Sequence, residues 1–300
     1  MHLSFGGGGA RAIVYASFLQ RLAEKPSGQH ALRSVESVSG VSAGAMVGSA
    51  FAMGITPSTI LDSMTHSVFE GSWTYYPRML ATAMQLRANM YDSTVLSDRL
   101  HALCDGRTLK MPFTAAVTPA KYDQACLSYH TGTSASSVVP AVTASSAVPF
   151  VIAPVVLQGL GACMDGGADR CNIAMSEVRA RARTGQPVMI VSSGPWPGFR
   201  QEKTGTRKEL LFRQLSNLVA HSFEDLEKDL GPDFKYHDGV FRFKNVTFVA
   251  PKGAVYAANG GYDVSANLRY QHNSDQVRRL KQEGRDIADE YMVKFGKIHL

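Results

Sequence analysis

Cysteine and long apolar runs are both scarce in this chain of 300 residues. The first shortage argues against a cysteine-bound zinc site, and the second argues against a membrane-spanning protein. The four cysteines, Cys104, Cys126, Cys163 and Cys171, form no C-x-x-C pair and no cluster with zinc-ligand spacing. We therefore expect reduced thiols and no bound metal. The least charged stretch, 132–164, contains three prolines, which argues against a membrane span.

Dense runs of Lys and Arg with interleaved aromatic residues are also lacking, although the formal net charge is +6. A mild positive excess favours contact with anionic surfaces, but without such runs we predict no nucleic-acid partner. The chain shows no basic amino-terminal region of the kind that begins a secretory signal peptide. We expect a cytoplasmic protein whose contact with a membrane is peripheral.

The pattern of apolar residues predicts strands that alternate with helices. Strands are predicted at residues 2–5, 34–39, 113–118, 124–130, 187–193 and 246–250. Helices are predicted at residues 10–24, 43–53, 172–183, 207–230 and 274–295, with a polar loop at 25–33. This order is typical of an α/β sandwich of three layers around a central, mostly parallel or mixed sheet. Because no repeat or low-complexity linker divides the chain, we expect residues 1–300 to form a single domain.

A G-x-S-x-G pentapeptide at residues 40–44 follows the second predicted strand, with Ser42 at its centre. In a nucleophile elbow the serine lies on a strained turn between a strand and a helix, so its neighbours must be small. The amino end of the following helix favours negative charge that develops nearby. The pattern arises by chance in roughly one in five such sequences. A tight turn with an idle serine therefore stays open as the alternative.

A run of four glycines, residues 6–9, follows the first predicted strand. Glycines allow backbone N–H groups to approach a ligand closely, which suits an oxyanion. We predict that amides of Gly7, Gly8 and Gly9 form an oxyanion hole, and the amide of Ala43 is a further candidate. The carboxyl ends of parallel strands meet at one edge of a sheet, so the glycine run and the serine turn are expected to lie side by side.

The same glycine run also permits a different function. Residues 7–12 satisfy the relaxed G-x-G-x-x-A pattern of dinucleotide-binding proteins, which would make the protein a nucleotide-binding oxidoreductase. Glu36 lies roughly where an acid that binds ribose is sought. However, this residue falls inside the second predicted strand, and the end of that strand carries Ser42.

A carboxylate, Asp165, precedes two glycines and follows an apolar segment. It is a candidate general base for the serine, although D-G-G alone is a common turn. His221 and His237 follow in the chain order of a Ser-acid-His triad. The first falls in a predicted amphipathic helix and the second in a polar loop, so we expect surface or packing roles for both.

Together these segments resemble the patatin-like phospholipase family. Residues 7–11 are similar to its glycine-rich oxyanion motif, residues 40–44 to its serine elbow and residues 165–167 to its Asp-Gly motif. Residues 144–150 resemble its lead-in to the acid strand, and Asn172 resembles the asparagine that follows. The order and spacing of these segments agree with the family along the first part of the chain.

The resemblance covers residues 2–175 and implies a patatin-like variant of the α/β hydrolase fold. It implies a dyad of Ser42 and Asp165 that works without histidine, metal or cofactor on a phospholipid or another acyl lipid. Two departures occur: Ala12 stands where the family usually has glycine, and Asn172 is displaced by one residue. Neither removes a reacting group.

Two further features have more than one interpretation. Arg11 is a candidate either for anchoring the glycine loop or for binding an anionic head group. The aromatic and methionine-rich stretch at residues 73–91 is either a surface that faces lipid or the core face of a helix. The sequence also leaves room for a lipid-binding module that requires a protein activator.

Overall fold

A computed structural model gives the fold of the chain. It describes residues 1–66, 78, 81, 88–120, 126–169, 172–198, 224, 226–259, 272 and 274–296. Most of the aromatic and methionine-rich stretch, most of the helix predicted at 207–230, and His221 lie outside the described residues.

The strands join into one sheet with the order β5-β6-β3-β2-β1-β7-β9-β8, and β4 also pairs with β3. Their bounds are β1 His2–Phe5, β2 Ser37–Gly40, β3 Phe113–Pro119, β4 Leu127–His130, β5 Val155–Leu157, β6 Gly161–Asp165, β7 Val188–Val191, β8 Phe241–Phe243 and β9 Val246–Val249. The five central strands, β3-β2-β1-β7-β9, pair in parallel, whereas the outer pairs are antiparallel. The prediction of a mostly parallel or mixed sheet is confirmed.

Helices precede and follow most of the central strands. The described helices are η1 Gly9–Arg11, α1 Ala12–Ala23, α2 Pro26–Arg33, α3 Ala43–Ala52, α4 Pro57–Met64, α6 Thr94–Cys104, α7 Ala135–Ser145, η2 Gly166–Asp169, α8 Met175–Arg183, α10 Gly253–Ala258 and α12 Asp275–Phe295. The prediction of a polar loop at 25–33 is wrong, because α2 occupies it. Pro26 stands in the first turn, where its fixed φ starts a helix, and Ala31 is buried.

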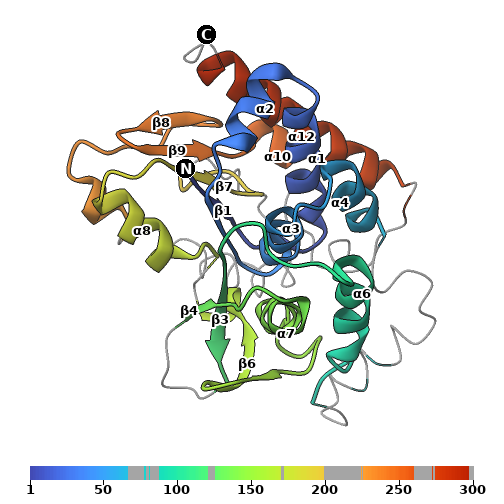
Figure 1. Cartoon of the computed structure of the whole chain (residues 1–300). Helices are drawn as coiled ribbons and strands as arrows, with labels where there is room; N and C mark the ends of the chain where they lie inside the picture. Colours follow the sequence, from blue (N-terminus) through green and yellow to red (C-terminus); the bar gives the residue numbers. More distant parts are fainter. Residues whose placement is uncertain are drawn as a thin grey trace.

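Apolar side chains cover both faces of the sheet, which gives three layers. On β7, Met189 and Val191 belong to the large core cluster shared by α1, α3, α7 and α12. Val188 and Ile190 point to the opposite face, where they join a second cluster with residues of α8 and several aromatic rings. Figure 1 shows α8 on one side of β1 and β7, with α1, α3 and α12 on the other.

Strand β1 lies at the centre of the sheet and is buried along its whole length. His2 reaches Ser37 and Ser39 on β2, with each ring nitrogen 2.9 Å from a hydroxyl oxygen. Burial lowers the pKa of His2 to about 3, with the charges of Arg181 and the terminal amine adding to the effect. The imidazole is therefore neutral at physiological pH and serves as a hydrogen-bonding core residue.

The cysteines correct one expectation from the sequence. Cys104 and Cys163 are free and buried, but Cys126 is disulfide-bonded. Its partner lies outside the described residues. The expectation that all four cysteines are reduced thiols is therefore wrong, and the spacing of the cysteines alone gave no sign of a pair.

Candidate active site

Ser42 forms the turn between β2 and α3. Its backbone angles are φ 52° and ψ −123°, in the left-handed half of conformational space that residues other than glycine rarely adopt. The neighbouring glycines make this turn possible. A Cβ atom on Gly44 would lie 2.4 Å from the carbonyl oxygen of Gly6, so the elbow packs directly on the glycine loop. The strained serine predicted from the G-x-S-x-G motif is therefore present.

The end of α7 holds the backbone of Ser42 from both sides. The Ser42 amide donates to the hydroxyl of Ser145 at 3.0 Å, and that hydroxyl donates to the carbonyl of Ala116 on β3 at 2.6 Å. The Ser146 hydroxyl donates to the Ser42 carbonyl at 3.1 Å. We call this pair, Ser145 and Ser146, the serine clamp. It ties the strained turn to the neighbouring strand.

Asp165 is the last residue of β6 and lies opposite Val117 in the antiparallel pair with β3. Its amide donates to the Ala147 carbonyl at 3.0 Å, just after the serine clamp. The following loop approaches the serine elbow closely. A Cβ atom on Gly166 would lie 2.7 Å from the Ala116 carbonyl oxygen and 2.9 Å from Cγ1 of Val41. Glycine at this position is thus what allows the carboxylate loop to approach the nucleophile turn.

The carboxyl group of Asp165 is buried, with 5% of the residue exposed. Burial raises its pKa to about 6, because the charged form loses solvation. Hydrogen bonds from the Ser42 side chain and from the Gly167 amide work in the opposite direction and lower the pKa. The Gly167 amide lies 2.8 Å from Oδ1 of the carboxylate. The serine hydroxyl therefore belongs to the hydrogen-bonding shell of this acid.

The glycine loop lies against Ser42. A Cβ atom on Gly7 would lie 3.5 Å from Cβ of Ser42, although its own amide already donates to the Asn172 carbonyl at 2.9 Å. The amides of Gly8, Gly9 and Ala43 have no hydrogen-bond acceptor among the described residues. Of the three predicted glycine donors, the first is thus engaged in holding the loop, and the other two are not engaged among the described residues.

Arg11 is buried, with 2% of the residue exposed, and it anchors the glycine loop from behind. Its guanidinium donates to the Ser193 carbonyl and pairs with the carboxylate of Glu283 on α12. The same group lies 4.6 Å from the ring centre of Tyr256. Of the two roles considered from the sequence, these contacts fit the anchoring of the glycine loop.

The residues of the rival hypotheses lie away from this site. Glu36 precedes the first residue of β2, at the amino end of the strand, where it pairs with the terminal amine. It therefore lies at the edge of the sheet opposite the glycine loop. His237 is exposed and its ring contacts Phe241. Among the described residues, the group able to hold a metal ion is also elsewhere, at Asp62, His66 and His272.

A sheet of this topology with a strained serine, a buried carboxylate and free loop amides at one edge defines a hydrolase-like α/β domain. The patatin-like phospholipase family matches residues 3–175, which is more than half of the chain. The chain belongs to this family.

Comparison with solved structures supports the fold through the first of two similar proteins. VipD from Legionella pneumophila superposes with a TM-score of 0.53 at 15% identity, over 98% of this chain and 66% of that one. Human GIVD cytosolic phospholipase A2 gives a TM-score of 0.46 at 12% identity, over 98% of this chain and 58% of that one. This chain thus spans less than two thirds of either protein. No curated protein matches it.

Proposed function

We propose that the protein hydrolyses acyl esters of lipids, with Ser42 as nucleophile and Asp165 as general base. The observation that carries this proposal is the buried carboxylate of Asp165 in hydrogen-bonding relation to the strained Ser42. A carboxylate with a pKa of about 6 is ionised near neutral pH yet basic enough to accept a proton in the transition state. Membership in the patatin-like family supports the same reaction class.

In the proposed reaction, Oγ of Ser42 attacks the carbonyl carbon of the ester while its proton passes to Asp165. The tetrahedral intermediate collapses when the protonated acid returns this proton to the departing alcohol oxygen, which leaves an acyl-serine ester. Water then attacks the acyl carbonyl with the carboxylate again as base. The fatty acid departs and both side chains regain their starting states.

Negative charge in this reaction develops on the carbonyl oxygen of the substrate. The amides of Gly8, Gly9 and Ala43 are the donors we assign to it, since Gly7 places the glycine loop against Ser42, Ala43 follows Ser42, and these three amides are not engaged among the described residues. Ala43 also begins α3, whose amino end adds a favourable partial charge. The buried Arg11 fixes this loop and does not touch the substrate.

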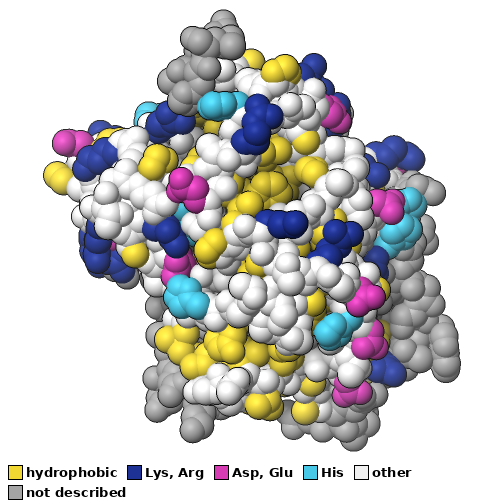
Figure 2. Space-filling view, in the orientation of Figure 1, with side chains coloured by type: hydrophobic (Ala, Val, Ile, Leu, Met, Phe, Trp, Pro, Cys, Tyr) yellow, Lys and Arg dark blue, Asp and Glu magenta, His cyan; other side chains and the backbone are white. Residues whose placement is uncertain are grey.

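The substrate class follows from the family and from the surface. Family membership points to a phospholipid, and we keep the wider class of acyl lipids. Figure 2 shows apolar side chains gathered on the lower part of one face, where Figure 1 places β3, β4, β6 and α7. Phe150 and Val156, between α7 and β6, are 71% and 76% exposed. No described helix is long and apolar enough to cross a membrane. We infer a peripheral contact with lipid through this face.

The decisive experiment is active-site labelling followed by an assay of fatty-acid release. A fluorophosphonate probe should modify Ser42 alone, as mapped by mass spectrometry, and Ser42→Ala should abolish both labelling and release of fatty acid from phosphatidylcholine. Ser58→Ala, an exposed serine on α4, is the matched control and should behave as wild type.

Each alternative has its own outcome in this experiment. Full esterase activity in Ser42→Ala would overturn the assignment, and saturable binding of a nicotinamide or flavin nucleotide would support the oxidoreductase instead. Labelling of Ser42 without release of fatty acid from any lipid would contradict a self-sufficient hydrolase and favour a module that needs an activator.

A further inference from the structure

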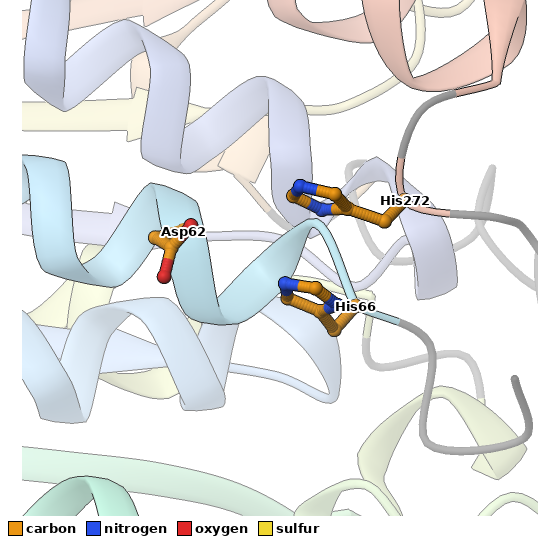
Figure 3. Close-up of side chains that lie close together, drawn as sticks. All are labelled: Asp62, His66 and His272. Carbon is orange, nitrogen blue, oxygen red and sulfur yellow. The ribbon is translucent and has the colours of Figure 1, made fainter.

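A second group of chemically capable side chains lies outside the proposed active site. Asp62 on α4, His66 just after that helix, and His272 just before α12 each offer one ligand atom, and these atoms all lie within 4.8 Å of one another. Figure 3 shows the two imidazole rings one above the other, with Asp62 to one side of them. We propose that these three side chains bind a zinc ion.

The local chain geometry favours chelation by the first two ligands. Asp62 and His66 are four positions apart at the carboxyl end of α4, and the backbone continues in a helical turn through Thr65. Side chains four positions apart share one face of a helix, so their donor atoms can reach a common point. The same spacing allows two helical histidines to bind zinc in metalloproteases.

The third ligand comes from a distant part of the chain. The rings of His66 and His272 are stacked, with centres 3.9 Å apart and planes at 4°. Nitrogen lone pairs lie in the ring plane, so two parallel rings do not yet converge on one ion. Ligand atoms about 2.0 Å from zinc require the stack to open as the rings tilt. Asp62 and His66 are exposed and His272 is half-buried, so the side chains have room for this adjustment.

The ligand set selects the kind of ion. Two imidazole nitrogens and one carboxylate oxygen suit zinc, and three protein ligands leave one position of a tetrahedron for water. Calcium and magnesium prefer sites built mainly from oxygen ligands, which this group does not supply. The donor set thus distinguishes zinc from the hard divalent cations.

A zinc ion here would join two elements that the sheet does not connect directly. The site links the end of α4 to the residues just before α12, the helix that carries Glu283. That residue pairs with Arg11 behind the glycine loop. The expected consequence is a more stable packing of α12, and it does not depend on the proposed reaction.

The test uses the full chain without a histidine tag. Titration with zinc chloride, followed by calorimetry, should give one ion per chain with a dissociation constant in the micromolar range or below. His66→Ala and His272→Ala should each weaken binding by about tenfold or more, and Asp62→Asn should weaken it less. Cobalt chloride should give visible absorption bands of tetrahedral cobalt, lost in the same variants.

Stability provides an independent readout. Zinc at one hundred times its dissociation constant for wild type should raise Tm by about 5 °C in wild type and by about half of that or less in either histidine variant. His101→Ala, an exposed histidine on α6, is the matched control and should retain binding. No binding at 100 µM zinc, or equal binding by wild type and His66→Ala, would overturn the proposal.

Discussion

Two buried carboxylates are linked to the glycine loop, Glu283 through Arg11 and Asp165 through Ser42, and their surroundings differ. Glu283 is 1% exposed and its two oxygens meet Arg11 and Asn259, so both its charge and its hydrogen-bonding capacity are satisfied. Asp165 is 5% exposed but forms no ion pair among the described residues. Its partners are the Ser42 side chain and the Gly167 amide. Burial alone therefore does not tell which acid is structural and which is reactive.

The difference lies in what compensates for the lost solvation. A buried ion pair holds elements together, and removal of one partner leaves an uncompensated charge. A buried carboxylate without a cation stays poised between its two protonation states, which is costly for folding and useful for proton transfer. The two acids thus predict opposite results from similar substitutions.

Asp165→Asn should have the largest effect on activity. The amide cannot accept the serine proton, so kcat/KM for ester hydrolysis should fall by about 10⁴-fold. The same change removes a buried charge, so the free energy of unfolding at pH 8 should rise by about 1–3 kcal/mol. Ester hydrolysis and urea denaturation measure the two effects. A variant that is both active and less stable would contradict the role of Asp165 as an unpaired base.

Glu283→Gln should instead lower the stability of the fold and largely preserve the reactivity of Ser42. It leaves the Arg11 guanidinium buried without a counter-charge, and the free energy of unfolding should fall by about 3 kcal/mol. Labelling of Ser42 by a fluorophosphonate should stay within about tenfold of wild type, since the dyad is intact. The double variant Arg11→Met with Glu283→Leu should recover most of the stability. A loss of labelling as large as that in Asp165→Asn would place Glu283 in the reaction itself.

The pH dependence of the free energy of unfolding should also reveal the unpaired carboxyl group of Asp165. Because the folded-state pKa of Asp165 is about 6 and lies above its ordinary value of 3.8, the folded protein holds this proton more tightly than the unfolded chain. This contribution to stability is complete below pH 3.8 and is lost as pH rises to 6. The loss amounts to about 3 kcal/mol.

Activity should change in the opposite direction, since only the carboxylate is a base. We expect kcat/KM to rise with pH and to level off above an apparent pKa near 6. Denaturation of wild type and Asp165→Asn across pH 4–8 isolates the contribution of Asp165 to the free energy of unfolding, since the asparagine variant lacks this titration. Parallel pH profiles for the two proteins would show that the carboxyl group does not titrate in this range.

The serine clamp should give the smallest effect. Ser145→Ala leaves the Ser42 amide without its acceptor, so the free energy of unfolding should fall by about 1–2 kcal/mol and kcat by about tenfold. The apparent pKa near 6 should not move, which separates positioning from proton transfer. Ser136→Ala, at the exposed start of α7, is the control. Equal kcat values in Ser145→Ala and Ser136→Ala would contradict a positioning role for the serine clamp.

The sequence predicts the surroundings of Asp165 and Ser42 well. Residues 40–44 and 6–9 follow adjacent parallel strands, so strand order alone brings them to one edge of the sheet. The D-G-G segment made Asp165 a candidate base but left a common turn open, and the family resemblance then supported the carboxylate. The dyad and the oxyanion donors remain predictions of function, and the amide of one predicted donor, Gly7, is already bonded to Asn172.

The surroundings of Glu283 depend on contacts that no local sequence pattern encodes, as do the serine clamp and the proposed zinc site. Arg11 and Glu283 are 272 positions apart, and the latter lies in a helix whose sequence gives no sign of a buried partner. The serine clamp was recognised only as a stretch leading to the acid strand. The zinc ligands include a pair at helical spacing, but His272 joins them only through tertiary packing. Local patterns predict elements and turns, whereas these pairings require the folded chain.

The central place of β1 has a consequence for how the chain is made. One edge of β1 pairs with β2, which is complete by residue 40, but the other edge waits for β7 at Val188–Val191. At ribosomal speeds of about 5–20 residues per second, that edge stays unpaired for on the order of ten seconds. Unpaired backbone groups on a strand edge that stays open for so long are where wrong pairing begins. We therefore expect the nascent chain to be most open to wrong pairing until β7, the fourth of its central strands in chain order, emerges.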